Sequence, residues 1–352
     1  MNKRKNNSYY LPKRIGIIHS DVKRKYFPTE SSFITEKDAA VEAKLVAKHL
    51  EKIGIKCTLY PGNSLLPFKL KRDKPEVVIN FVGSFKGLDF LSSTVPGVLE
   101  LLEIPYTGAG ILGESLNYNK FLVKKLLEQN GIPVPNYQLF NTPYDILNPN
   151  LRFPLISKLN EVHGAVEITL DSVSETEKHL RDRLKFLIKT YDQPVLVEEF
   201  IVGREINAAL LEGLNKKVYL AETIFKGPKR KYSFKAFELQ WYKKYADSIS
   251  YKKYKDPILN EYVKKAFIIT EMADYGRFDI RLDNSGRYYF LDANSNPHLA
   301  PKETGSPLTE ILALYGISFI NIMKRLLINT IRDELGKERI SLTPNSQGDN
   351  GS

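Results

Sequence analysis

The chain has 352 residues, 42% of them hydrophobic, which is more than one compact core usually holds, so we expect two or three globular domains. Its single cysteine, Cys57, excludes an internal disulfide and a metal site built from several cysteines. The formal net charge is +11, but the basic residues are spread along the chain and form no motif of a nucleic-acid-binding module, so we expect no nucleic-acid partner.

Residues 1–13 are predicted to be disordered. Their basic start, Met1–Lys5, lacks the long apolar segment that would follow it in a signal peptide. No apolar run in the chain approaches the ~20 residues that span a bilayer. We therefore expect a cytoplasmic protein with no membrane partner.

A first domain is predicted over residues 14–112. Two short apolar runs, Arg14–Ser20 and Pro75–Val82, are typical of buried parallel strands. Between them lie an amphipathic helix over Glu36–Ile53 and a strand over Lys56–Tyr60. Because strands and helices alternate in this order, we expect a doubly wound parallel sheet of the α/β class.

The pattern changes after residue 112 and predicts α+β structure in two parts. In the first part, residues 113–192, helices and a strand are expected at Asn119–Gln129, Phe153–Leu159 and Ser174–Thr190. In the second part, residues 193–333, strands are expected at Pro194–Ile201, Glu205–Leu211 and Val218–Phe225, and helices at Asn260–Ala273, Thr309–Leu314 and Ile320–Arg332. Residues 334–352 are polar and are predicted to form a disordered tail.

The stretch Gly276–Pro297 carries the clearest chemical signal. It predicts two strands joined at Asn284-Ser285-Gly286, because Asn and Gly suit a tight turn. The hairpin brings Asp279 beside Asp292 and Asn294, which share one face of a strand. Such an oxygen cluster suits Mg²⁺ (or Mn²⁺) held together with substrate phosphates. Taken alone, the pattern also fits a solvated hairpin with ordinary surface acids.

Four separated segments resemble, in the same order, the ATP-grasp superfamily and within it the D-alanine–D-alanine ligase branch: Val95–Gly108, Lys120–Pro135, Val195–Leu211 and Gly276–Pro297. The resemblance implies an ATP-grasp fold, with a pre-ATP-grasp α/β domain followed by two α+β subdomains that grip ATP between antiparallel sheets. It also implies an ADP-forming reaction, in which ATP phosphorylates a carboxylate and an amine then attacks the acyl phosphate.

The resemblance also implies roles for residues at the nucleotide. Lys120 and Lys158 match two lysines that contact ATP, whereas without the resemblance each would be read as a solvated or snorkelling lysine. Glu205 matches an acid that binds the ribose. The adenine is received largely through backbone groups by a hinge that matches Glu198, Glu199, Phe200 and Ile201.

Further roles concern the transferred phosphoryl group and the substrate. Asp279, Asp292 and Asn294 match the Mg²⁺ ligands, with an aspartate at 292 where glutamate is commoner, and Arg277 matches the arginine that stabilises the transferring phosphoryl group. Arg281 follows one strand alternation after Asp279 and is expected to contact a substrate carboxylate, or else to lie on the surface. The basic, aromatic-rich stretch after Lys226 is expected to contain a lid, in which Lys235 contacts the phosphates.

Departures from the family pattern fall on the acceptor side. The loop Asn160–Glu167 has His163 and Glu167 in a segment that is rich in Gly and Ser in the family, and His298, which we assign to the substrate, stands where glycine is common. Specificity resides in the groups that touch the substrate. We therefore predict an ATP-dependent carboxylate–amine ligase that acts on an amino acid or small peptide. We do not expect its product to be D-alanyl-D-alanine.

The same departures motivate an alternative, a non-catalytic ATP-grasp-like protein that binds nucleotide in a regulatory role. Retention of the metal ligands argues against it, because a protein without catalysis would not need them. A polyanion-binding protein is a third possibility that rests on charge alone. Small-molecule carboxylate and amine substrates are the expected partners, and members of the ligase branch are often homodimers.

Overall fold

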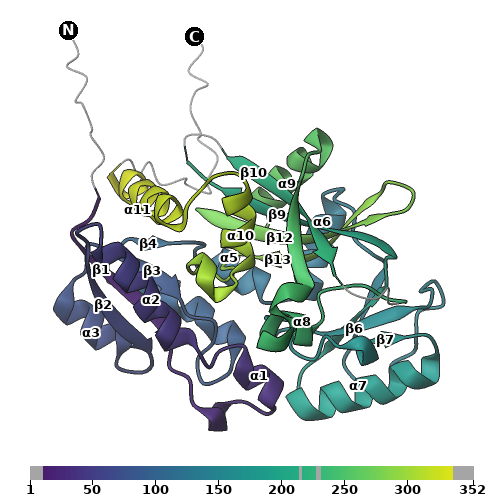
Figure 1. Cartoon of the computed structure of the whole chain (residues 1–352). Coiled ribbons are helices and arrows are strands. Elements are labelled where there is room, and N and C mark those ends of the chain that lie inside the picture. The colour runs from purple at the N-terminus through teal and green to yellow at the C-terminus, as the bar shows by residue number, and fades with distance from the viewer. Residues whose placement is uncertain (1–10, 214–215, 227–230, 336–352) are drawn as a thin grey trace, which may run out of the picture.

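The structure is a computed structural model that describes residues 11–213, 216–226 and 231–335 (Figure 1). Most of the two ends predicted to be disordered lies outside these residues. Within them, Leu11 packs against the core of the N-terminal sheet, and the last helix, α11 (Phe319–Leu335), extends past residue 333. Residues 11–13 and 334–335, which were predicted to be disordered, therefore belong to the described structure.

The N-terminal part contains a four-stranded parallel sheet in the order β2-β1-β3-β4. Its strands are β1 (Arg14–Ser20), β2 (Lys56–Gly62), β3 (Val77–Phe81) and β4 (Tyr106–Thr107). Strands β1 and β3 are buried along most of their length, as their apolar runs predicted, because helices cover the sheet. The helices of this part are α1 (Glu30–Ile34), α2 (Ala39–Glu51), α3 (Leu66–Asp73) and α4 (Thr94–Leu101).

A second sheet has the order β5-β8-β6-β7 and is antiparallel. Its strands are β5 (Tyr137–Phe140), β6 (Leu155–Leu159), β7 (Val173–Ser174) and β8 (Val195–Glu199). Helix α7 (Glu177–Tyr191) packs against it through Leu180, Leu184 and Leu187, whose spacing places them on one helix face.

The largest sheet is antiparallel and has the order β11-β10-β9-β12-β13. Its strands are β9 (Gly203–Leu211), β10 (Lys217–Phe225), β11 (Ile249–Tyr254), β12 (Tyr275–Asp283) and β13 (Tyr288–Asn294). Helices α6 (Lys120–Gln129) and α9 (Pro257–Ile269) share its core. Strand β11 and helix α8 (Phe237–Trp241) were not predicted, since their stretch was read only as basic and aromatic.

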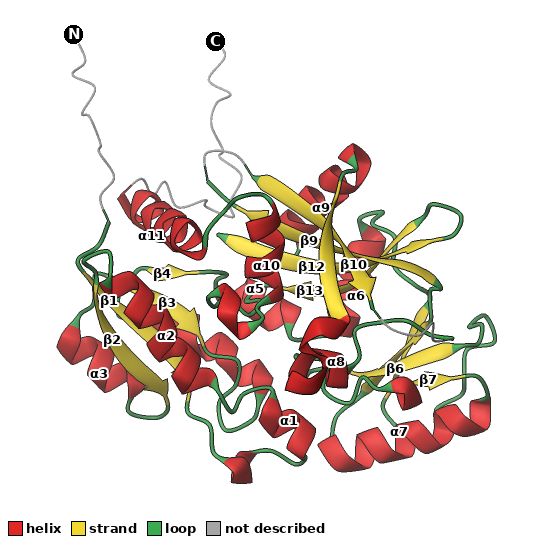
Figure 2. Ribbon diagram, viewed as in Figure 1, coloured by secondary structure: helices red, strands yellow, loops and turns green. Residues whose placement is uncertain are grey.

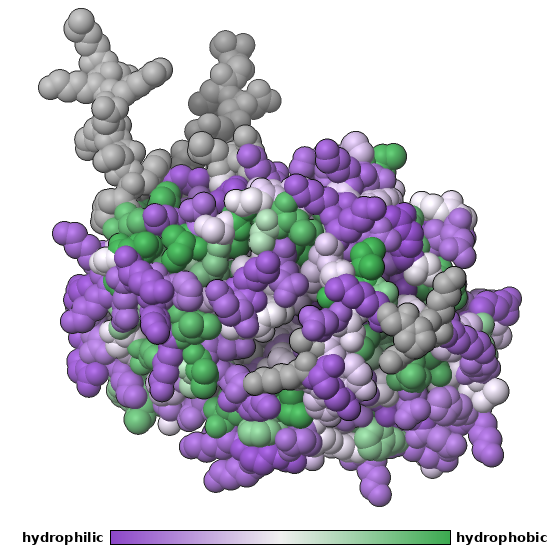
Figure 3. Space-filling view, viewed as in Figure 1, coloured by the Kyte–Doolittle hydropathy of each residue, from purple (hydrophilic) through white to green (hydrophobic). Residues whose placement is uncertain are grey.

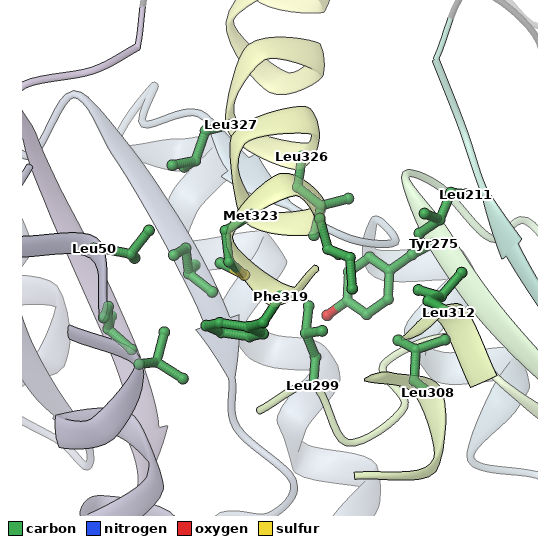
Figure 4. Packing of buried hydrophobic residues seen from close by; sticks show 14 of the residues in the cluster. Leu50, Leu211, Tyr275, Leu299, Leu308, Leu312, Phe319, Met323, Leu326 and Leu327 are labelled. Carbon is green, nitrogen blue, oxygen red and sulfur yellow. The ribbon is translucent and has the colours of Figure 1, made fainter. Parts of the chain in front are cut away.

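The C-terminal helices join the N-terminal sheet to the largest sheet (Figures 1 and 2). Helix α11 packs on β3 and β4, whereas α10 (Pro307–Leu314) packs on β9, β10 and β11. Leu50 of α2, Met323 of α11 and Leu312 of α10 belong to one continuous core, whose packing Figure 4 shows. The predicted boundary at residue 112 falls within helix α5 (Ile111–Asn117).

Hydrophilic residues dominate the face drawn in Figure 3. In the described ranges no single helix is long and apolar enough to cross a membrane. The pair Pro307–Leu314 and Phe319–Arg332 passes that test only jointly and is bent by 102°. The apolar side chains of this pair are the ones buried in the shared core.

Candidate active site

A cavity lies between the second sheet and the largest sheet, and the predicted site residues converge on it. Its lining includes all of them except His298: Lys120, Lys158, Glu198, Glu199, Phe200, Ile201, Glu205, Lys235, Arg277, Asp279, Arg281, Asp292 and Asn294. These residues come from chain segments about 170 positions apart, which the two sheets bring together. The fold therefore assembles one site from the separated motifs.

The predicted metal ligands face one another across the hairpin of β12 and β13. The strand register pairs Asp279 with Asp292 and Arg277 with Asn294, and Asn294 Nδ2 lies 3.5 Å from Asp279 Oδ2. Asp292 Oδ1 is buried without a hydrogen-bond partner among the described residues. In the same ranges no group of three or more His, Cys, Asp and Glu side chains could hold a metal. Two carboxylates and an amide, completed by substrate phosphates, fit Mg²⁺.

Nearby cations keep both carboxylates ionised. Burial would raise the pKa of Asp279, but the charges of Arg277 and Lys235 outweigh it and lower the pKa to about 2. Arg277 forms the closer contacts, with its Nε and Nη2 at 3.1 and 3.0 Å from the two carboxylate oxygens. The pKa of Asp292 is also lowered, because Lys158 and Lys120 outweigh the effect of burial. Both groups are therefore anionic at neutral pH, as cation ligands must be.

Lys158 and Glu198 belong to a buried chain of alternating charges. Lys158 Nζ lies 3.0 Å from Glu198 Oε2 and 3.4 Å from Asp292 Oδ2. The other Glu198 oxygen lies 2.9 Å from Lys124 Nζ, which also donates to the carbonyls of Phe290 and Leu291. The sequence analysis missed Lys124, although its place one turn after Lys120 on α6 was an available signal.

Contacts within the protein limit which groups of the predicted hinge could bind adenine. The Glu198 carboxylate is fully buried and engaged with two lysines, so it cannot also contact adenine. The Glu199 carboxylate accepts hydrogen bonds from Asn136 Nδ2 and the Arg152 backbone N–H. The backbone N–H groups of Glu199 and Phe200 donate to the carbonyls of Asn136 and Pro154, so these two hinge donors are also engaged within the protein.

An apolar wall stands beside the hinge, and it can receive a flat aromatic base. Phe200 contacts Phe234 edge to face, with ring centres 5.8 Å apart. Ile156 and Ile168, which also line the cavity, belong to the same apolar cluster. Such a mixture of apolar walls and a few polar groups is typical of small-molecule sites.

Arg281 is not a surface residue, so that alternative is wrong. Its side chain is 3% exposed, lies 3.5 Å from Glu205 and donates hydrogen bonds to the carbonyls of Gly203 and Ser233. Its guanidinium also lies 5.3 Å from the ring centre of Phe200. Arg281 thus stands at the end of the cavity that holds Glu205, the predicted ribose acid, and not at the loop Asn160–Glu167.

Lys235 lines the cavity from the side of the predicted lid. Its Nζ donates to Asn207 Oδ1 at 2.6 Å and lies 3.5 Å from Glu205 and 3.7 Å from Asp279. Asn207 was missed, although it shares a face of β9 with Glu205 and pairs in register with Asp279. Part of the predicted lid, residues 227–230, lies outside the described residues.

Two histidines differ in their position relative to the cavity. His163 lines it, with Nδ1 at 2.5 Å from Asp89 and Nε2 at 3.3 Å from Glu36. Desolvation would lower the pKa of His163, but the two carboxylates raise it to about 10. His298 is instead 2.9 Å from Glu42 on α2 and is not among the lining residues. A substrate contact by His298 therefore lacks geometric support.

Known proteins resemble this chain in sequence and in fold. Residues 126–328 match the protein family described as the D-Ala-D-Ala ligase C-terminus. The chain belongs to the D-alanine–D-alanine ligase family. Membership confirms the predicted ATP-grasp resemblance and the enzyme class, an ADP-forming ligase that makes a carbon–nitrogen bond.

Individual members of the D-alanine–D-alanine ligase family are similar over most of their length. A D-alanine–D-alanine ligase of Aquifex aeolicus is 28% identical over 286 residues, which cover 77% of this chain and 92% of that protein. An uncharacterized protein of Sinorhizobium fredii is 29% identical over 73% of this chain and 79% of its own. The structure of the Bacillus anthracis D-alanine–D-alanine ligase complexed with ATP superposes with a TM-score of 0.69 at 20% identity, covering 92% and 99% of the two chains. That likeness confirms the predicted fold class.

Proposed function

We propose that this ligase joins an amino acid or small peptide to an amine in a reaction other than D-alanyl-D-alanine synthesis. The observation that carries the proposal is the contrast between the two ends of the cavity. The nucleotide end keeps the lysines, acids and arginine of the family. The acceptor end has an imidazole bracketed by the carboxylates of Glu36 and Asp89 in a loop where the family is rich in Gly and Ser.

The nucleotide end supports binding of ATP between the two antiparallel sheets. The apolar wall around Phe200 would receive the base, and Glu205 would accept hydrogen bonds from the ribose. Lys158 and Lys120 would supply positive charge for the phosphates. The pKa of Lys158 is raised, since Asp292 and Glu198 outweigh burial, so its ammonium stays charged.

Phosphoryl transfer depends on alignment and charge neutralisation more than on covalent help. Asp279, Asp292 and Asn294 would hold Mg²⁺, which supplies compensation for the phosphate charge when it is bound. Arg277 is fixed by two contacts with Asp279, so its guanidinium presents a positive charge that does not have to reorganise. Lys235 adds a second cation from the lid side.

The acceptor end would orient the carboxylate and amine substrates. The indole N–H of Trp241, on lid helix α8, donates to the carbonyl of Gly164, so the lid covers the loop that ends the cavity. Exclusion of water at this point would protect an activated carboxylate from hydrolysis. Because His163 is a charged side chain in a loop where small residues are common, and Glu36 and Asp89 hold it there, it would select other substrates than the family's usual pair.

The test is ADP release from Mg-ATP across a panel of amino acids and dipeptides, alone and in pairs, with D-alanine included. We expect turnover with one pair other than two D-alanines, and loss of turnover in Asp292→Ala. Asp283→Asn is a matched control, because Asp283 lies on the same hairpin but not in the cavity lining. Preferred turnover of two D-alanines would refute the substrate proposal. ATP binding without any turnover would favour the regulatory nucleotide-binding alternative.

A further inference from the structure

The loop Asn160–Glu167, called here the nucleotide loop, carries two charged side chains: Glu167 has no part in the proposed function, and His163 enters it only as a group at the acceptor end. His163 and Glu167 stand where small residues are common in the family, and both reach out of their own subdomain. Several residues of this loop, from Val162 to Val166, line the cavity. Its position therefore affects the space that is left for the phosphates of ATP.

His163 ties the middle of the nucleotide loop to the N-terminal part of the chain. Its imidazole lies 2.5 Å from Asp89 and 3.3 Å from Glu36, and its backbone N–H donates to the same Asp89 oxygen at 2.9 Å. The carboxylates of Asp89 and Glu36 are only 7% and 6% exposed. Buried carboxylates are costly without a counter-charge, so these contacts stabilise the loop in one place.

Glu167 ties the end of the same loop. Its Oε1 accepts hydrogen bonds from Ser31 Oγ of α1 at 2.7 Å and from Tyr191 Oη of α7 at 2.9 Å. Arg183 donates to the Glu167 carbonyl at 2.5 Å. The backbone of Glu167 has φ of 61°, a left-handed conformation that favours glycine. The side-chain contacts explain how a glutamate is held in that conformation.

Between these two contacts the loop is enclosed from both sides. A Cβ atom on Gly164 would come within 2.9 Å of the Thr35 side chain, so the loop backbone packs directly on the segment that follows α1. From the lid side, Trp241 Nε1 donates to the Gly164 carbonyl at 2.8 Å. The nucleotide loop is thus the place where the N-terminal part, the second sheet and the lid meet.

We propose that His163 and Glu167 are positioning residues that fasten the nucleotide loop to the N-terminal part of the chain, so that the loop is ordered before ATP binds. The inference rests on the proposed function only in taking the ligand of this cavity to be ATP. A loop that is already ordered binds with less loss of conformational entropy, so the two contacts should strengthen ATP binding.

Hydrogen exchange of the full-length protein without ATP tests the fastening directly. In His163→Gln and Glu167→Gly, we expect the amides of residues 160–168 to exchange about tenfold faster, with little change elsewhere. Ser31→Ala, which removes one hydroxyl group, should give a smaller increase at the same amides. Glu161→Gln is the control, because Glu161 lies on the same loop but its side chain has no ion pair among the residues that the structure covers.

ATP affinity provides the second measurement. Trp241 is the only tryptophan of the chain, so its emission reports binding of Mg-ATP at the adjoining loop. We expect Kd for ATP to rise about tenfold in His163→Gln and Glu167→Gly. The melting temperature of Glu161→Gln and Ser31→Ala should be unchanged. A purely structural role would lower the melting temperature without this selective loss of affinity.

The outcomes separate this inference from the proposed function. If the wild-type protein binds no ATP, the proposed function fails, while exchange in the ATP-free protein still decides the fastening. Loop amides that exchange at the wild-type rate in His163→Gln and Glu167→Gly would refute the inference. Faster exchange spread evenly over the whole chain, without an excess at residues 160–168 in any variant, would refute it as well.

Discussion

Asp292 has one carboxylate oxygen 3.4 Å from Lys158 and a second, buried oxygen without a hydrogen-bond partner in the described part of the chain. Asp292→Asn keeps the size of the side chain and removes its charge. We expect ADP release to fall by about 10²–10³-fold, as for other losses of electrostatic stabilisation, and the Mg²⁺ requirement to rise. Asp292→Glu restores the family's commoner residue and should keep activity. Equal Mg²⁺ half-saturation in Asp292→Asn and wild type would contradict the metal role.

His163 should be an imidazolium at physiological pH. Its pKa is raised from 6.5 to about 10, so its stabilising effect is complete below about pH 6.5 and is lost as pH rises through 10. Its side chain is 35% exposed, and solvent screening limits the effect to about 1 kcal/mol. NMR should give a histidine signal that is absent in His163→Gln and still protonated at pH 8. A His163 signal that titrates near 6.5 would exclude the charged pair with Asp89.

Residues of the site were predictable where the chain itself fixes their relation. Asp279 and Asp292 belong to one hairpin, so local turn chemistry brings them together. Asp89 was missed because its partner His163 lies on another element, and no local pattern marks such a contact. Lys124 and Asn207 each had a local signal, beside Lys120 and Glu205, but their partners Glu198 and Lys235 also lie on other elements. For the same reason the sequence could not indicate that Glu198 is committed to two lysines.

Helices and strands, like the site residues, were predictable where a local pattern in the sequence marks them. Apolar strands such as β3 and amphipathic helices such as α7 were predictable, because burial of one face or of both imposes a period on the sequence. Strand β11 was missed, since it is an edge strand that carries the exposed Lys252 and Lys253 and has no fully buried residue. Lysines on an edge strand prevent further pairing and also erase the hydrophobic signal.

Lys124 of helix α6 pairs with the buried Glu198 of the second sheet, and Lys124→Met removes this positive charge. Glu198 would then keep only Lys158 as a counter-charge, and loss of one partner from a buried ion pair costs about 3–5 kcal/mol of unfolding free energy. Lys125→Met is the control, because Lys125 is half exposed and its ion pair with the equally exposed Glu128 is long, at 3.7 Å. Urea unfolding measures both. Equal stability of the two variants would show that the Glu198 pair does not need Lys124.

At the scale of the whole molecule, the three sheets are not independent units. The N-terminal sheet completes its core with α11, which lies at the opposite end of the sequence. Helix α10, next to α11 in the chain, covers the largest sheet, which contributes Asp279 and Asp292 to the site. A domain normally has its own core. The core of the N-terminal part includes α11 from the other end of the chain. Composition could therefore locate a change of pattern near residue 112, but it could not show that the N-terminal sheet depends on α11 for its core.

Met323→Ala tests whether that shared core couples the N-terminal part to the site. Met323 is fully buried in α11, so truncation should lower the unfolding free energy by about 2–5 kcal/mol. Lys324→Ala, at the next position, should have little effect. Because one core joins the two sheets, exchange protection of β3 in the N-terminal sheet and of β12 in the largest sheet should fall together in Met323→Ala. Loss of protection in β3 alone would mean that the N-terminal part unfolds separately and that α11 does not couple it to the metal-binding hairpin.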